Sequence, residues 1–330
     1  MTVLVTGANG FVGAAVVRAL LAEGESVRAL VRAASDRRNL EGLPVEQREG
    51  DITRPETLRP ALAGCGVVFH VAADYRLWAP DSERMHAPNV QGSLNGLAAA
   101  AAAGAERLVY TSSVATLGIR PDRKPADEET PVALGDMIGP YKRSKFLAEE
   151  AVRRRAAELG FPVVTVNPST PIGPGDIKPT PTGRVILDAA AGRMPAFVDT
   201  GLNLVHVDDV AAGHVAALKR GRPGERYILG GADMSLEAIL RVVARCRGRR
   251  PPRLRLPRWS VYPAAFASEW LAARTGREPR VTLDGLRMSA KHMYFSSGKA
   301  ERELGYRWRD PEQAIADAVD WFRRNGYLSA

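Results

Sequence analysis

The first half of the chain alternates short apolar runs with stretches of helical periodicity, and this alternation limits the possible folds more than any other feature. Six short runs are predicted as strands, at 2–6, 26–31, 45–49, 67–71, 107–111 and 162–166, and all but 45–49 are mainly apolar. Helices fit between them at 11–23, 55–63, 89–103 and 141–159. Such alternation is typical of a parallel sheet covered by helices on both faces. We therefore predict a doubly wound α/β domain over residues 1–167.

The pattern changes after residue 167. The segment 168–183 contains five prolines and three glycines, which predicts an irregular and functional loop. Short strands and helices then alternate up to a last helix at 311–324. Because 330 residues fit two domains, we expect a smaller C-terminal α/β substrate lobe made of 168–202 and 231–330, with 203–230 returning to the first domain.

Composition excludes several classes of protein. Apolar residues make up 45% and charged residues 25%, as in a globular core. The two cysteines, Cys65 and Cys246, are too few for a disulfide framework or a thiolate cluster. The five histidines are scattered, so we expect no metal. Apolar runs are too short to cross a bilayer, and a strand follows Met1 directly, so we expect a cytoplasmic protein.

One segment contributes much of the positive charge, because eight arginines lie between Arg241 and Arg258 in a chain of net charge +9. No helix-turn-helix or zinc-finger spacing accompanies them, so we expect no nucleic-acid partner. Aromatic residues follow at helical spacing: Trp259, Tyr262, Phe266 and Trp270. Residues 241–270 are therefore a candidate for peripheral membrane contact. The favoured alternative is a helix packed on the substrate lobe or in a subunit interface.

The sequence TGANGFVG at 6–13 stands at the turn from the first predicted strand to the first predicted helix. Gly7, Gly10 and Gly13 permit a tight turn and a close backbone approach. The helix N-terminus, at Phe11 and Val12, then offers free N–H groups and a positive dipole end to a pyrophosphate. In this strand–turn–helix context the glycines predict a dinucleotide-binding, Rossmann-type domain.

The end of the second predicted strand bears on which dinucleotide binds. NAD sites usually place an acidic residue there, whereas NADP needs a cation. Here Arg32 follows Val31, and the first carboxylate comes only at Asp36. We predict that Arg32 pairs with a 2′-phosphate and that the cofactor is NADP, with NAD and a merely surface-exposed arginine as the alternatives.

A candidate catalytic set lies further along the chain. Tyr141 and Lys145 are four residues apart, and hence on one face of a predicted helix. The ammonium is expected to lower the pKa of Tyr141 and to make it an acid or base near neutral pH. Thr111, Ser112 and Ser113 end the fifth predicted strand, at the edge where α/β sheets bind ligands. A serine hydroxyl there can hydrogen-bond the oxygen of a reacting carbinol or carbonyl.

Together these motifs resemble the extended short-chain dehydrogenase/reductase family and its NAD-dependent epimerase/dehydratase group. The matching motifs are TGANGFVG at 6–13, the serine run at 111–113 and YKRSK at 141–145. Further matches are DI at 51–52, HVAA at 70–73, NP at 167–168 and HVDD at 206–209. The resemblance covers nearly the whole chain.

The resemblance implies Ser113, Tyr141 and Lys145 as catalytic residues, with Ser113 preferred to Ser112 by its distance from Gly118. It implies a structural role for His206. The expected cofactor-binding residues are Gly7, Gly10, Phe11, Val12, Gly13, Arg32, Asp51, Ile52, Val71, Ala72, Ala73, Thr111, Tyr141, Lys145 and Pro168.

Longer blocks, at 70–80, 137–149, 167–184 and 194–214, are similar to the hopanoid-associated sugar epimerase subfamily. One position departs from related enzymes. UDP-sugar epimerases carry an Arg-Asp pair before the His-Val motif, where the arginine grips the diphosphate, but this chain has Leu202 and Asn203 there. The departure counts against a UDP-sugar substrate. Dihydroflavonol-reductase-like carbonyl reductases also lack that arginine.

The substrate-binding residues are expected near the nicotinamide. Tyr75 and Trp78 follow the fourth predicted strand, and they either line the pocket or pack the loop. Lys178, in the proline-rich segment, is placed to bind an anionic or polyhydroxyl group, or else is solvated. Ser113 and Asn167 complete the expected set.

The sequence thus predicts an NAD(P)-dependent oxidoreductase that transfers hydride at a carbinol or carbonyl carbon of a small-molecule or lipid-linked sugar or polyol substrate in hopanoid biosynthesis. Net reduction or oxidation with an exchangeable cofactor is preferred to epimerisation. The alternatives are a dihydroflavonol-reductase-like NADPH carbonyl reductase with an unrelated substrate, and a non-catalytic dinucleotide sensor. The intact serine–tyrosine–lysine set argues against the sensor. We expect a homodimer.

Overall fold

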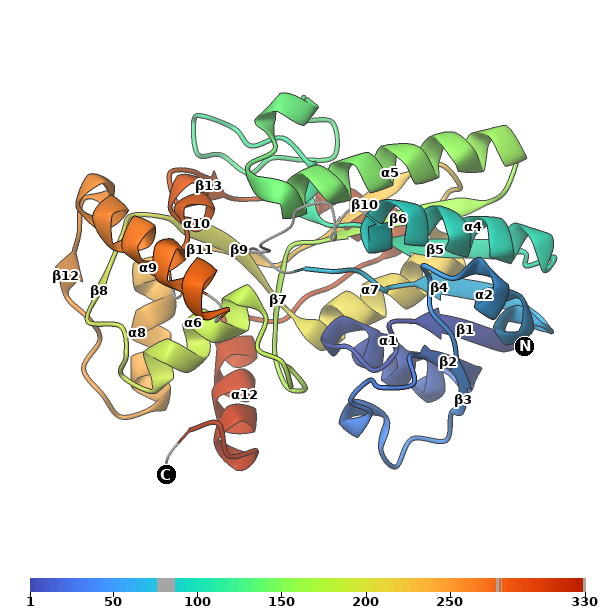
Figure 1. Ribbon diagram of the computed structural model, residues 1–330, viewed down its shortest axis with the longest axis horizontal. Helices are drawn as coiled ribbons and strands as arrows, with labels where there is room; N and C mark the ends of the chain where they lie inside the picture. The colour runs from blue at the N-terminus through green and yellow to red at the C-terminus, as the bar shows by residue number, and fades with distance from the viewer. Residues whose placement is uncertain (76–86, 277–278, 280, 329–330) are drawn as a thin grey trace.

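The computed structural model describes residues 1–75, 87–276, 279 and 281–328, and it is built around a seven-stranded sheet (Figure 1). The strand order is β10-β6-β5-β4-β1-β2-β3, and each neighbouring pair is parallel. The strands are β1 Thr2–Thr6, β2 Ser26–Val31, β3 Glu46–Glu49, β4 Cys65–His70, β5 Arg107–Thr111, β6 Val163–Pro168 and β10 Arg226–Leu229. The predicted doubly wound α/β fold of the Rossmann type is confirmed.

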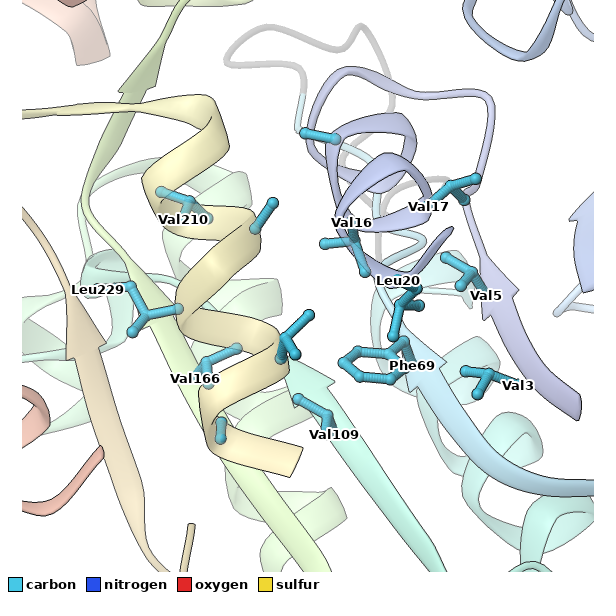
Figure 2. Close-up of a cluster of buried hydrophobic side chains, with 14 of the residues drawn as sticks. Val3, Val5, Val16, Val17, Leu20, Phe69, Val109, Val166, Val210 and Leu229 are labelled. Atoms are coloured by element: carbon cyan, nitrogen blue, oxygen red, sulfur yellow. The ribbon is translucent and has the colours of Figure 1, made fainter. Parts of the chain in front are cut away.

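Alternating side chains explain why helices cover both faces of this sheet. Val3 and Val5 of β1 point to the face that carries α1 (Phe11–Ala22) and α7 (Val207–Arg220), in the core that Figure 2 shows. Leu4, between them, packs in a second core on the opposite face. That face carries three helices: α2 Pro55–Leu62, α4 Gly92–Ala102 and α5 Gly139–Leu159.

The order of the strands creates a crevice at the carboxyl ends of β1 and β4. From β1 the chain moves outward to β2 and β3, then returns to β4 on the other side of β1 and continues to β5 and β6. Ligands of open α/β sheets bind where the strand order reverses in this way. The motifs predicted to bind a dinucleotide flank this point.

The C-terminal half forms a second layer around a smaller sheet of order β11-β9-β13, in which β7 also pairs with β9. Its core is formed by apolar residues of α6, α8 and α12, together with Leu204 of β9. The elements are β7 Thr170–Ile172, α6 Pro181–Ala190, β8 Ala196–Phe197, β9 Gly201–His206, β11 Ala232–Ser235, α8 Leu236–Cys246, β12 Leu254–Arg255, α9 Tyr262–Thr275, α10 Leu283–Met288, β13 His292–Met293, α11 Gly298–Leu304 and α12 Pro311–Arg324.

The proline-rich segment 168–183 is more regular than predicted, because its prolines occupy positions that regular elements tolerate. Pro171 lies in β7, which pairs with β9 and, among the strands that the structure describes, with no other, so its second edge can accommodate a proline. Pro181 begins α6, where the missing N–H is not needed, and Thr180 caps that helix through its side chain.

The basic and aromatic segment forms β12, the short helix η5 (Arg258–Val261) and α9. Trp259, Phe266 and Trp270 are at least half exposed. The aromatic stripe is therefore not buried by its own lobe, although Ala265 and Ala272 of α9 are buried there, and a subunit interface stays a prediction. No helix in the described ranges is long and apolar enough to cross a membrane.

Candidate active site

The glycine turn between β1 and α1 closes tightly against the end of β4. Gly7 has a φ of +66°, and a Cβ built on it would lie 2.8 Å from the Cα and N atoms of Ala72. A Cβ on Gly13 would lie 2.1 Å from the Gly7 carbonyl oxygen. Only glycine fits at either position. The turn is closed by the Gly10 amide, which donates to the Gly7 carbonyl oxygen at 2.9 Å.

The N-terminus of α1 presents its first amides at this turn. Gly10 is the N-cap, and no side chain caps the helix there. The amides of Phe11 and Val12 are thus available to an anion, and the helix dipole favours one. The end of β4 is fixed beside them, because Thr6 Oγ1 accepts from the amides of Val71 and Ala72, each at 3.2 Å.

At the outer edge of the sheet, Arg32 follows β2 and Asp51 follows β3. Burial acts to raise the pKa of Asp51, but hydrogen bonds from Thr53 and the charges of Arg32 and Arg54 hold this pKa below its ordinary value. Arg32 therefore lies close enough to Asp51 to affect it. Next to Asp51, the Ile52 carbonyl oxygen accepts from the side chain of Asn95 at 2.9 Å.

Arg32 differs from its two neighbouring arginines. Arg37 pairs with Glu49 at 2.9 Å, and Arg38 pairs with Asp36 at 2.7 Å. Within the described ranges, no ion pair is found for the exposed Arg32. Of the three, it is the cation left available for a ligand.

The predicted catalytic residues are brought together at the carboxyl end of β5 and the start of α5. Tyr141 is the third residue of α5 and hydrogen-bonds with Ser113. Lys145 lies one turn further along the same face, and its Nζ donates to the Thr111 carbonyl oxygen at 2.9 Å. The three side chains and the end of β5 thus form one cluster beside the crevice.

The electrostatics of this cluster differ from the prediction. Burial raises the pKa of Tyr141, and the hydrogen bond with Ser113 opposes the rise only in part. The expected lowering by the ammonium is wrong, because desolvation of the phenolate outweighs the favourable interactions. Burial also lowers the pKa of Lys145 to about 8, against the attraction of Glu149.

A buried network of polar side chains holds the loop after β5, which contains Ser113. Glu149 Oε2 accepts from Thr116 Oγ1 at 2.7 Å and from Asn167 Nδ2 at 2.9 Å, and it also accepts from Ser112. Asn167 Nδ2 lies 3.1 Å from the Ser113 carbonyl oxygen. Sequence reasoning missed Glu149, although a carboxylate eight residues after Tyr141 on the inner face of a helix was a usable signal.

Asn167 was predicted to bind substrate, and the structure places it under the catalytic loop. It is fully buried at the end of β6, and its Nδ2 bonds to groups of the protein. Its Oδ1 has no hydrogen-bond partner among the described residues. The adjacent Pro168 ends β6.

Asn89 is a second residue that sequence reasoning missed. It lies in the short η2 helix (Ala87–Gln91) and joins the loop after β4 to α5. Its Oδ1 accepts from the Asp74 amide at 2.7 Å, and its Nδ2 donates to Ser144 Oγ at 2.9 Å. Ser144 in turn donates to the Tyr141 carbonyl oxygen at 2.9 Å. This chain of bonds fixes the first turn of the catalytic helix.

Two loops meet beyond the catalytic cluster. Tyr75, 40% exposed, donates through its hydroxyl to the Lys178 carbonyl oxygen at 3.4 Å. The structure thus brings together two of the residues predicted to bind substrate. Trp78 lies outside the described residues. His206, at the end of β9, accepts from the Asp208 amide at 3.0 Å and contacts Asp317 at 3.2 Å.

The chain was compared with known proteins at three levels. Residues 3–230 match the model of the NAD dependent epimerase/dehydratase family. The putative dihydroflavonol 4-reductase of Synechocystis is 48% identical over 98% of this chain and 95% of that protein. Sterol demethylase protein B of Methylococcus capsulatus is 37% identical over 99% of this chain and all of its own length. The crystal structure of gox2253 superposes with a TM-score of 0.90 at 54% identity, covering 99% of each chain.

Proposed function

Because the chain belongs to the NAD-dependent epimerase/dehydratase family of extended short-chain dehydrogenases/reductases, we propose a specific reaction for it. The reaction is NADPH-dependent reduction of a carbonyl group on the sugar or polyol side chain of a hopanoid lipid, and its reverse. The observation that carries the proposal is the cluster of Ser113, Tyr141 and Lys145 beside the dinucleotide crevice.

The residues around the crevice fit a dinucleotide. A Cβ on Gly10 would meet only the Gly7 carbonyl oxygen, at 3.1 Å, so the space above the turn is open to a ligand. The uncapped start of α1 suits a pyrophosphate, and Val71, Ala72 and Ala73 continue the binding surface towards the catalytic cluster. Such a cofactor supplies or accepts a hydride at nicotinamide C4.

The catalytic side chains have separate roles in the reduction. Ser113 donates a hydrogen bond to the carbonyl oxygen and polarises it. Tyr141 gives its phenolic proton to that oxygen as hydride reaches the carbon, so the C=O bond becomes a carbinol. The phenolate then regains a proton from solvent. Because burial raises its pKa, Tyr141 is protonated at neutral pH, which suits the acid of a reduction.

We propose NADP as the preferred cofactor on the basis of Arg32. Its guanidinium stands at the end of β2, where the adenine ribose of a Rossmann-type site lies, and Arg37 and Arg38 are already paired with carboxylates. A 2′-phosphate would give Arg32 a charge-assisted partner. NAD remains the alternative.

The surroundings of Asn203 favour net reduction over the epimerisation of a nucleotide sugar. Asn203 is buried in β9, and its Nδ2 donates to the Gly231 and Phe295 carbonyl oxygens and to Asp233. Its Oδ1 accepts from the Gly231 amide at 2.9 Å. Leu202, the residue before it, stands where UDP-sugar epimerases carry the arginine that grips the diphosphate, and its apolar side chain cannot take that role.

The names of two relatives support a polycyclic lipid as the substrate. One of them is named for a sterol and another for a dihydroflavonol, which are fused-ring compounds. A hopanoid has the same polycyclic character. An unrelated fused-ring carbonyl compound is the second candidate substrate, because the Synechocystis relative is a putative reductase of that kind.

We also propose that the enzyme works in the cytoplasm as a homodimer. Support for the compartment comes from Cys65 and Cys246, which are both free thiols. Sedimentation of the purified protein tests the dimer, and fractionation of cells tests the compartment.

The test of the proposed reaction uses the purified protein with NADPH and hopanoid aldehydes or lactols. We expect NADPH absorbance at 340 nm to fall as the alcohol forms. Tyr141→Phe should lower turnover by at least about a hundredfold, the usual scale for a positioned acid, while NADPH binding, followed by fluorescence, persists. Trp308→Phe, at an exposed aromatic residue between α11 and α12, is the control and should keep full activity. Undiminished turnover in Tyr141→Phe would refute the mechanism.

A further inference from the structure

The outer surface of η5 and α9 carries large apolar side chains that the rest of the described residues leave exposed. The exposed fraction is 75% for Trp259, 65% for Phe266, 50% for Trp270 and 55% for Leu271. We call these four residues the aromatic surface. In α9 only Ala265 and Ala272 are buried, among the residues described. Exposed apolar clusters of this kind commonly mark the sites at which a protein binds a partner or a membrane.

Positive charge adjoins the aromatic surface. Arg250 and Arg253 lie just before it, and neither forms an ion pair within the described ranges. The guanidinium of Arg274 stacks 3.8 Å from the ring centre of Trp270. Aromatic rings with arginines at their border match the interface of an anionic bilayer, where rings sit at the headgroup level and cations meet lipid phosphates.

The charge also argues against a second copy of this chain as the occupant. A two-fold contact brings the same patch of both copies together, so the positive charge of both patches would lie within one interface. Like charges in such a contact are unfavourable. An anionic bilayer complements the patch.

The aromatic surface is connected to the catalytic helix through α10. The Leu283 amide at the start of α10 donates to Glu269 of α9 at 2.7 Å. Asp284 of α10 packs against Gly139, the first residue of α5, where a Cβ would lie 2.8 Å from its Oδ2. Tyr141 is two residues further on. Figure 1 shows α9 and α10 side by side on the part of the C-terminal lobe that faces away from β3.

We propose that η5 and α9 dock the enzyme on anionic membranes, with the aromatic surface at the headgroup level and Arg250 and Arg253 on lipid phosphates. Docking in this orientation places the bilayer on α9, which α10 connects to the start of α5. A lipid substrate can then reach Tyr141 from the membrane, a consequence that rests on the proposed function, whereas the docking itself does not.

The test measures sedimentation of the purified full chain with vesicles, without substrate or cofactor, so its outcome is independent of the proposed reaction. We expect binding to phosphatidylcholine vesicles that contain about 30% phosphatidylglycerol, no binding to phosphatidylcholine alone, and loss of binding in about 0.5 M salt. Phe266→Ser/Trp270→Ser and Arg250→Glu/Arg253→Glu should each weaken vesicle affinity by about tenfold or more.

A charge-matched control separates the patch from the overall charge. Arg59→Glu/Arg307→Glu changes two exposed arginines outside the patch and should bind vesicles like the wild type. Thermal melting checks that every variant is folded. Equal weakening by the control pair, or no binding to anionic vesicles at all, would overturn the proposal. So would conversion of a wild-type dimer to a monomer by Phe266→Ser/Trp270→Ser, which would make the surface a subunit contact.

Discussion

At the residue scale, burial sets the protonation of the side chains that we propose as catalytic. Tyr141 keeps its proton at neutral pH because the phenolate is desolvated, and Lys145 is a cation that burial makes easier to deprotonate. Both effects arise from segments distant in sequence that pack around the start of α5. The spacing of Tyr141 and Lys145 correctly indicated their shared face, but spacing alone could not give the direction of the tyrosine shift.

The choice of cofactor is tested at Arg32. Arg32→Ala should weaken NADPH binding by about 1.5–3 kcal/mol, the worth of one charge-assisted hydrogen bond, and leave NADH binding nearly unchanged. Arg38→Ala, which removes an arginine already paired with Asp36, is the control and should affect the two cofactors equally. Fluorescence titration with each nucleotide measures both. An equal loss for NADPH and NADH in Arg32→Ala would rule out the 2′-phosphate contact.

Lys142 gives a prediction about pH. Burial, with the nearby charge of Lys291, lowers the pKa of Lys142 to about 8 from an ordinary value of 10.5. Between these two values the unfolded chain binds more protons than the folded protein, so this group makes stability rise with pH. We expect Lys142→Met to be more stable than the wild type at pH 7, and the difference in unfolding free energy to shrink towards pH 10.

Urea unfolding at pH 7, 8.5 and 10 measures this difference in the free energy of unfolding. A pKa lowered by one pH unit corresponds to a difference of about 1.4 kcal/mol. Lys124→Met, at an exposed lysine, is the control and should stay within about 0.5 kcal/mol of the wild type throughout. A stability gain in Lys142→Met that did not change with pH would show that packing, not charge, is the cause.

At the element scale, α5 and the loop after β5 act as one unit because Glu149 joins them. Its carboxylate accepts hydrogen bonds from Thr116 of the loop and Asn167 of β6, and it also bonds Arg226 of β10 at 3.3 Å. The carboxylate thus connects the catalytic helix to three other segments. The position of Ser113 depends on these contacts.

Glu149→Gln should disturb this unit, because an amide brings N–H groups to face existing donors. We expect the free energy of unfolding to fall by about 1–3 kcal/mol, as for other buried polar groups left unsatisfied. We also expect kcat to fall more than the affinity for NADPH. The neighbouring Glu150→Gln, on the exposed side of α5, is the matched control and should change stability by less than about 0.5 kcal/mol. Indistinguishable behaviour of the two variants would contradict this role.

The elements of the central sheet were the part of the fold most accessible from sequence. Strands such as β1 and β5 were predicted at their observed bounds, because buried parallel strands are local apolar runs bounded by turns. The proline-rich segment was predicted less well, since β7 exists only through its pairing with the distant β9. Glu149 and Asn89 were not predicted because their hydrogen-bond partners lie on elements distant in sequence.

At the scale of the whole molecule, the fold places two surfaces next to the start of α5. One is the crevice at the ends of β1 and β4, with the glycine turn on its floor. The other is the C-terminal lobe, which brings the Lys178 loop to Tyr75 and carries α10 to Gly139. In the proposed reaction, cofactor and substrate would thus approach Tyr141 from different halves of the chain.

We have proposed that this arrangement performs net, NADPH-consuming reduction. A decisive experiment follows deuterium from NADPH labelled at both C4 positions into the product of a hopanoid aldehyde. We predict one deuterium on the new carbinol carbon of each product molecule and one NADP released for each. Inversion of a stereocentre, with no deuterium gained and no NADPH consumed, would contradict the claim and identify an epimerase.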